Sequence, residues 1–122
     1  MKIKRQIIVF DAADLTAESA FWAGMLSGRA VADDDGWHSV LVDGEWRMGF
    51  QLAPNHVPPA WPDGVQQQQI HLDLHVGALR AAHEEAISLG ARLLKPADDL
   101  EAAEAFQVYA DPAGHLFCLG RH

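Results

Sequence analysis

The same order of predicted elements recurs in the two halves of the sequence: a short β-branched run, a helix, and three further strand candidates. The helices predicted to begin at Leu15 and Leu79 start 64 residues apart. Near the end of each half, the segments Phe-Gln-Leu at 50–52 and Phe-Cys-Leu at 117–119 stand 67 residues apart. This spacing indicates an internal duplication with a short loop insertion in the second half. The sequence therefore predicts two βαβββ modules.

The first module is predicted over about residues 4–53. Its elements follow in chain order: a strand over 6–12, a helix over 15–26 and three strands within 29–53. The β-branched run in the first of these strands is typical of a strand that is buried on both faces. The helix is expected to bury Ala17, Ala20 and Phe21 on its apolar side. Gly28 is expected to end it, because glycine is favoured at the terminating position of helices.

The second module is predicted over about residues 67–122, after a proline-rich and glutamine-rich linker over about residues 54–66. Polar and apolar residues alternate from 71 to 76, which predicts a strand with one face on the core and one accessible face. A helix is predicted over 79–89, with His83 on its polar side in solvent. Three strands complete the module: residues 91–95, 106–110 and 116–121.

Each module has only one helix for four strands, so one sheet face is left for the other module or for a ligand. The expected fold class is α+β, with two βαβββ modules forming a cup-shaped, eight-stranded mixed sheet. The chain has 122 residues, which is the size of one typical domain. Residues 1–122 are therefore predicted to form a single domain.

The charge balance limits the classes of partner. Seventeen acidic residues stand against nine basic ones, which gives a formal net charge of −8. Such a chain is a poor match for a phosphate backbone or an anionic membrane surface, so neither nucleic acid nor a membrane is expected as a partner. The single cysteine, Cys118, excludes an intramolecular disulfide and is typical of a cytoplasmic protein.

Three segments carry a resemblance to a known group of proteins. They are residues 9–14 leading to Phe21-Trp22, residues 71–76 (His-Leu-Asp-Leu-His-Val) and residues 111–119 (Asp-Pro-Ala-Gly-His-Leu-Phe-Cys-Leu). In these segments the chain resembles the vicinal oxygen chelate superfamily, which includes glyoxalase I, extradiol dioxygenases and bleomycin and fosfomycin resistance proteins. The likeness is nearest to the small glyoxalase-like proteins of that superfamily. It implies the paired-module fold, and we expect a homodimer that binds a small-molecule ligand.

The resemblance also makes a metal site testable. Metal enzymes of this superfamily hold one divalent ion with side chains from the first and last strands of each module. The resemblance places these positions on Ile7, Gln51, His71 and Cys118. Only His71 matches, because Ile7 has no donor atom and Cys118 stands where the family has a carboxylate. A working site needs about three protein ligands, so no metal or other cofactor is expected. Zinc held by Gln51, His71 and Cys118 is the alternative.

A polar stripe, formed by His71, Asp73 and His75, lies on one face of the strand predicted over 71–76. We expect His71 to face a cavity, where it would bind a ligand or act as an acid or base, with Asp73 as its orienting partner or as a general base. In the alternative, His71 is a core histidine bonded within the protein. Asp73 would then be an ion-pair residue for Arg47 or Arg121.

Four further residues are candidate ligand contacts. Gln51 is expected to point inward, where its amide would bond a ligand carbonyl. Cys118 is either a small core residue or a reactive thiol. Trp37 and Trp46 flank a predicted hairpin turn, where they would stack on a planar ligand or pack against each other across the hairpin.

Three functions remain open from the sequence. The leading hypothesis is a metal-free cup that sequesters or carries a small, partly aromatic, cationic molecule. Its expected ligand contacts are Gln51, His71, Cys118, Trp37 and Trp46. The second is a metal-independent lyase or isomerase in which His71, held by Asp73, moves a proton. The third is a metal-dependent enzyme of the superfamily, such as a dioxygenase.

Overall fold

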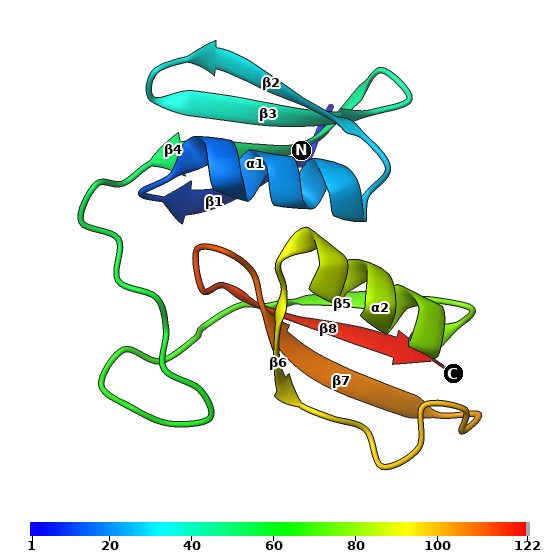
Figure 1. The fold of residues 1–122 in the computed structure, drawn as a ribbon. Helices are drawn as coiled ribbons and strands as arrows, with labels where there is room; N and C mark the ends of the chain where they lie inside the picture. Colours follow the sequence, from blue (N-terminus) through cyan, green and yellow to red (C-terminus); the bar gives the residue numbers. More distant parts are fainter. Residues whose placement is uncertain (122) are drawn as a thin grey trace. The chain divides into compact units, whose positions relative to one another are not determined.

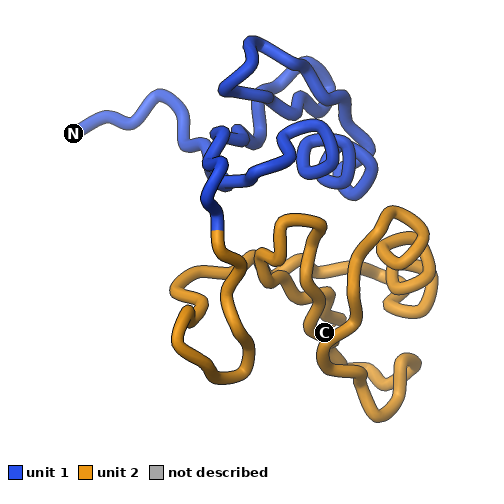
Figure 2. Tube along the Cα trace, turned by 60° about the vertical axis from the view of Figure 1, so that its left-hand side comes forward, with its two compact units in different colours: residues 1–56 blue, residues 57–122 orange. Residues whose placement is uncertain are grey.

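The computed structural model describes residues 1–121, within which there are two helices and eight strands (Figure 1). The chain divides into two compact units, residues 1–56 and residues 57–122, which Figure 2 colours separately. The division lies inside the predicted linker, so most of that linker belongs to the second unit. Within residues 1–121, neither helix is both long enough and apolar enough to cross a membrane.

The first unit forms one sheet and one helix. In chain order its elements are β1 (Ile8–Ala12), α1 (Leu15–Met25), β2 (Arg29–Asp34), β3 (Trp37–Val42) and β4 (Glu45–Leu52). The strand order is β1-β4-β3-β2, with β1 parallel to β4 and the other neighbours antiparallel. Asp43 and Gly44 have φ angles of 52° and 75°, and two positive φ angles are what a two-residue hairpin turn of type I′ requires. Asp14 caps α1, because its Oδ1 accepts a hydrogen bond from Ala17 N at 3.0 Å.

The second unit repeats this arrangement strand for strand. Its elements are β5 (Leu72–His75), α2 (Leu79–Leu89), β6 (Arg92–Lys95), β7 (Ala105–Ala110) and β8 (Leu116–Arg121). The strand order is β5-β8-β7-β6, with β5 parallel to β8. Gly90 ends α2 in the left-handed conformation, at φ 114°. The predicted α+β fold of two βαβββ modules is therefore confirmed, as two four-stranded mixed sheets. Closure of the two sheets into one cup stays a prediction.

Each helix covers one face of the sheet in its own unit and leaves the opposite face to other contacts (Figure 1). Beneath α1, Trp22 is fully buried, and its ring meets those of Phe10 and Phe21 edge-on at centroid distances of 5.6 and 5.3 Å. Beneath α2, Tyr109 stacks on Phe117 at 5.2 Å. Aromatic packing on the helix side therefore forms the centre of each core.

The expectation that the first strand is buried on both faces is wrong. Ile8 and Val9 of β1 are 38% and 42% exposed. The reason is the place of β1 at the edge of its sheet, where α1 covers only one face. A run of β-branched residues favours a strand but does not determine how many of its faces are covered.

The buried face of α1 also differs from the predicted one. Ala17 and Ala20 are exposed, whereas Glu18 and Ser19 are buried. The helix is rotated so that Trp22, one turn after these two polar residues, lies in the core. Burying one indole removes more apolar surface from water than burying two alanine methyl groups. Ser19 Oγ is bonded to Nδ1 of His38 at 3.0 Å, which compensates for the burial of the hydroxyl.

Two local expectations at the helices are corrected as well. α1 ends at Met25 with Leu26 as its C-cap, and Ser27 rather than Gly28 adopts the left-handed conformation, at φ 53°. Gly28 is instead a position of close approach, because a Cβ on it would collide with the backbone oxygen of Leu41. His83 of α2 does not stand free in solvent: its Nδ1 lies 2.9 Å from the Tyr109 hydroxyl.

Candidate functional site

The second sheet carries a cavity of about 650 Å³ on the face that α2 does not cover. Phe117 of β8 is buried and stacks on Tyr109, which is hydrogen-bonded to His83 of α2. Cys118 and Gly120 occupy the alternate positions of β8 and therefore point to the opposite face. The lining comes from β5, β8, the start of β7 and adjoining residues: His71, Asp73, His75, Glu104, Ala105, Phe106, Cys118, Gly120 and Arg121.

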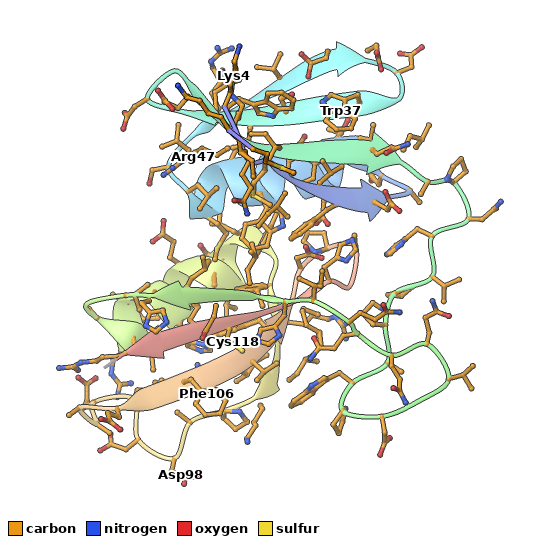
Figure 3. All side chains as sticks on the ribbon, turned by 180° about the vertical axis from the view of Figure 1, so that it is seen from behind. Lys4, Trp37, Arg47, Asp98, Phe106 and Cys118 are labelled. Atoms are coloured by element: carbon orange, nitrogen blue, oxygen red, sulfur yellow. The ribbon has the colours of Figure 1, made fainter. Side chains whose placement is uncertain are left out.

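The strand register explains why the sheet is hollow at this point. Gly120 stands between His75 of β5 and Phe106 of β7 in one row across the sheet. A Cβ placed on Gly120 would lie 3.8 Å from Phe106 Cβ and 4.0 Å from Asp73 Oδ1, which is ordinary contact distance. Since Gly120 has no side chain, the space between Phe106 and the polar residues of β5 stays open. Cys118 and Phe106 lie on neighbouring strands (Figure 3).

The predicted polar stripe forms one wall of the cavity. His71, Asp73 and His75 are all exposed, and all three line the cavity. The Nε2 atom of His75 lies 3.7 Å from Oδ2 of Asp73, an ion-pair distance when the imidazole is protonated. Asp73 thus lies near His75, whereas the sequence predicted it as the partner of His71.

The thiol of Cys118 is half-buried in the floor of the cavity. Burial raises its pKa, and the negative charge of Asp73, which faces it across the β5–β8 ladder, raises the pKa further. Both effects disfavour the thiolate. Cys118 therefore offers a ligand a neutral thiol at neutral pH, and a thiolate is the form that attacks electrophiles or binds zinc.

Alkylation kinetics test this electrostatic environment. Iodoacetamide reacts with the thiolate, so we expect the rate of Cys118 modification to rise with a midpoint above the pKa of an ordinary thiol. Asp73→Asn removes the charge that opposes the thiolate, so the midpoint of the rate profile is expected to shift to lower pH. Asp63→Asn, at an exposed position that does not line the cavity, is the matched control for net charge. An unchanged midpoint in Asp73→Asn would contradict the coupling between the two groups.

The positions that the resemblance assigned to a metal ion offer few donor atoms. Ile7 has no donor atom, and Gln51 offers only an amide oxygen. The absence of a bound metal stays a prediction. Among residues 1–121, no group of three or more histidine, cysteine, aspartate or glutamate side chains is arranged to hold a metal ion.

The predicted aromatic residues of the first module lie on the face of the first sheet that is turned away from α1. The rings of Trp37 and Trp46 meet edge-on at a centroid distance of 6.3 Å. The indole nitrogen of Trp37 donates to Ser39 Oγ at 3.2 Å, and that of Trp46 donates to Met48 O at 2.8 Å. Gln51, exposed on β4, is in register with Trp37. The two tryptophans thus pack against each other, and their role as ligand contacts stays a prediction.

Gly49 provides the space in which the ring of Trp37 lies. A Cβ on Gly49 would overlap Cζ2 of Trp37. We therefore expect Gly49→Ala to lower the free energy of unfolding by about 1–2 kcal/mol, since overpacking a filled contact is destabilising. Gly77→Ala, where a Cβ would meet nothing within 4 Å, is the matched control. Urea denaturation of both variants measures the difference, and equal stabilities would contradict this packing.

Three residues of the cavity lining were not predicted from the sequence: Phe106, Glu104 and Gly120. Phe106 was assigned to a strand without a role, although it is 50% exposed and forms the wall opposite the polar stripe. The signal that could have found it is the strand register, because pairing β7 with β8 sets Phe106 opposite Gly120. A large aromatic side chain beside a glycine on an uncovered sheet face indicates a hollow.

The comparisons with known proteins agree with this fold. No curated protein matches the sequence at a significant level. Among solved structures, the fosfomycin resistance protein FosX from Mesorhizobium loti is 14% identical with a TM-score of 0.70, and the match covers 100% of this chain and 94% of that one. FosX from Listeria monocytogenes, in its tetragonal crystal form, is 14% identical with a TM-score of 0.73, and the match covers 100% of this chain and 93% of that one. A glyoxalase-related enzyme from Fulvimarina pelagi is 20% identical with a TM-score of 0.68, and the match covers 98% of this chain and 89% of that one.

At these identities the structural likeness shows the fold alone, which is that of the vicinal oxygen chelate superfamily. The sequence evidence is independent of it and covers nearly the whole chain. The family model described as "Glyoxalase-like domain" matches residues 7–120. This chain therefore belongs to the glyoxalase-like domain family.

Proposed function

We propose that this protein binds a small organic molecule in the cavity of the second module and needs no bound metal to do so. The observation that supports this most is the composition of the cavity, in which a polar wall faces an aromatic one across a floor without bulky side chains. Its volume of about 650 Å³ lies within the range of small-molecule sites. Such sites combine an apolar surface for affinity with a few polar groups for orientation.

Each lining group has a proposed role. Phe106 supplies flat apolar contact, and the neutral thiol of Cys118 contacts the ligand from below. Asp73, His71 and His75 orient it by hydrogen bonds from the β5 side. That Gln51, Trp37 and Trp46 of the first module contact a ligand stays a separate prediction, which single alanine variants test.

Filling the cavity tests the proposal. We would screen a panel of small aromatic and polar metabolites by thermal shift, with and without a metal chelator, since a ligand that binds the native state raises its melting temperature. Gly120→Leu places a side chain in the cavity without removing any polar group. We expect it to abolish the shifts, while Gly77→Leu, outside the cavity, retains them. Shifts that survive in Gly120→Leu, or that depend on a metal, would overturn the proposal.

A second candidate function is proton transfer on a bound substrate by a metal-independent lyase or isomerase. The observation that favours it is the 3.7 Å approach of His75 Nε2 to Asp73 Oδ2, because a nearby carboxylate orients an imidazole for proton transfer. Turnover assays on oxoacids and thiol adducts, with His71→Ala and His75→Ala as separate variants, assign the base. Unchanged turnover in both variants would remove histidine from the mechanism.

The proposal includes two expectations from the sequence. The active form is a homodimer, and its location is the cytoplasm. Sedimentation velocity on the purified chain measures the first, and a purely monomeric species at micromolar concentration would contradict it.

A further inference from the structure

Phe106 is part of two cavities. It lines the cavity of about 650 Å³ and also a smaller one of about 410 Å³. The ammonium nitrogen of Lys95 lies over its ring, 5.2 Å from the centroid, and Lys95 lines only the smaller cavity. The ring therefore already accepts a cation on the side of the smaller cavity. Lys95 does not contribute to the lining of the larger cavity.

The fixed charges around the larger cavity are predominantly negative. Asp73 and Glu104 supply carboxylates, and Arg121 is the one permanently cationic side chain in its lining. Burial raises the pKa of the Cys118 thiol, and the negative charge of Asp73 raises it further. The charge of Asp73 therefore acts on a group that lines the cavity. The whole chain has a formal net charge of −8, which adds a long-range attraction for cations.

The hollow above Gly120 lies within reach of both kinds of group. A carbon atom bonded to Gly120 would stand 4.0 Å from Asp73 Oδ1 and 3.8 Å from Phe106 Cβ. We propose that the larger cavity binds an organic ammonium group above Gly120, between the Asp73 carboxylate and the ring of Phe106. This inference rests on the proposed function, because it names the ligand class of the same cavity. A carboxylate neutralises such a cation and an aromatic face attracts it without a large hydration penalty.

Three probes of nearly the same shape separate charge from size: choline, its uncharged isostere 3,3-dimethylbutanol, and the anion 3,3-dimethylbutanoate. Nuclear magnetic resonance titration of the full chain, read at the backbone amides of Cys118 and Gly120, measures binding at the site. We expect choline to bind most tightly and its affinity to fall as salt is added. The alcohol is expected to bind more weakly, and the anion most weakly of the three.

Two variants test the contacts. Phe106→Leu retains an apolar side chain but removes the aromatic face, and we expect it to weaken choline roughly 2- to 30-fold, the range given by measured cation–π interactions. Asp73→Asn is expected to weaken choline while leaving the alcohol unchanged. Asp63→Asn, which changes the net charge by the same amount outside the cavity, controls for long-range attraction. Dispersed amide spectra verify that each variant is folded.

The outcomes separate this inference from the proposed function. If the alcohol or the anion binds at these amides as tightly as choline, the ammonium assignment is wrong and small-molecule binding stands. The assignment is also wrong if Phe106→Leu and Asp73→Asn both leave choline affinity unchanged. If no probe shifts these amides and Gly120→Leu retains every hit of the metabolite panel, both proposals fail.

Discussion

Replacing Trp22 by alanine is expected to lower the free energy of unfolding of the first unit by about 3–5 kcal/mol. The indole is fully buried and contacts the rings of Phe10 and Phe21 edge-on. Its removal would forfeit these contacts and leave a cavity beneath α1, which a single-helix unit has few means to close. The burial of Trp22 also explains why Glu18 and Ser19 lie on the buried side of the helix, and the substitution removes this cause.

Denaturation of the full chain in urea, followed by circular dichroism, measures this effect. Trp22→Phe retains an aromatic ring in part of the space and is expected to cost less, about 1–2 kcal/mol. Ala20→Ser on the same helix is exposed and should stay within about 0.5 kcal/mol of the parent. A loss below about 1 kcal/mol in Trp22→Ala would be too small for a filled core position and would contradict the packing beneath α1.

The features that the sequence predicted correctly depend on local chemistry. The hairpin turn predicted between Trp37 and Trp46 forms at Asp43-Gly44, which adopt the two positive φ angles that such a turn needs. The helix predicted over 79–89 ends for a related reason, because Gly90 adopts the left-handed conformation. The duplication is visible because the order of elements recurs at nearly constant spacing. The alternation across β5 correctly predicted that His71, Asp73 and His75 share one accessible face.

The features that were missed depend on pairing between distant segments. The rotation of α1 is decided by which residue fills the space above the sheet, and periodicity alone favoured Ala17 and Ala20. Similarly, Phe106 becomes part of a site only because the β7–β8 register sets it beside Gly120. The proximity of Asp73 to His75 rather than to His71 depends on side-chain conformation, which residue spacing does not determine.

Gln107 is the second residue at which a large loss of stability is expected. Its Oε1 accepts a hydrogen bond from Ala97 N at 2.9 Å, and its Nε2 donates to the Tyr109 hydroxyl at 2.6 Å. The same Nε2 lies 3.1 Å from His83 Nδ1, so one buried amide connects β7, α2 and the loop after β6. Gln107→Leu retains the volume but leaves the amide of Ala97 without this acceptor. We expect a loss of about 1–3 kcal/mol, the range for a polar group inside the protein that loses its hydrogen-bond partner.

Ionisation of Tyr109 gives a second measurement in the same variant. Tyr109 is the only tyrosine of the chain, so the ultraviolet absorbance of tyrosinate reports on this residue alone. Burial raises its pKa, and the hydrogen bond from Gln107 lowers it in part. Because the pKa is higher in the folded than in the unfolded chain, the protonated phenol contributes to the free energy of unfolding. This contribution is fully present below the ordinary tyrosine pKa and is lost as the pH rises through the pKa of Tyr109 in the folded protein. In Gln107→Leu the tyrosinate is no longer hydrogen-bonded by the amide, so the pKa of Tyr109 is expected to rise further. Gln69→Leu, at an exposed position of the same unit, should change neither the stability nor the titration, and a fall in the Tyr109 pKa in Gln107→Leu would contradict this network.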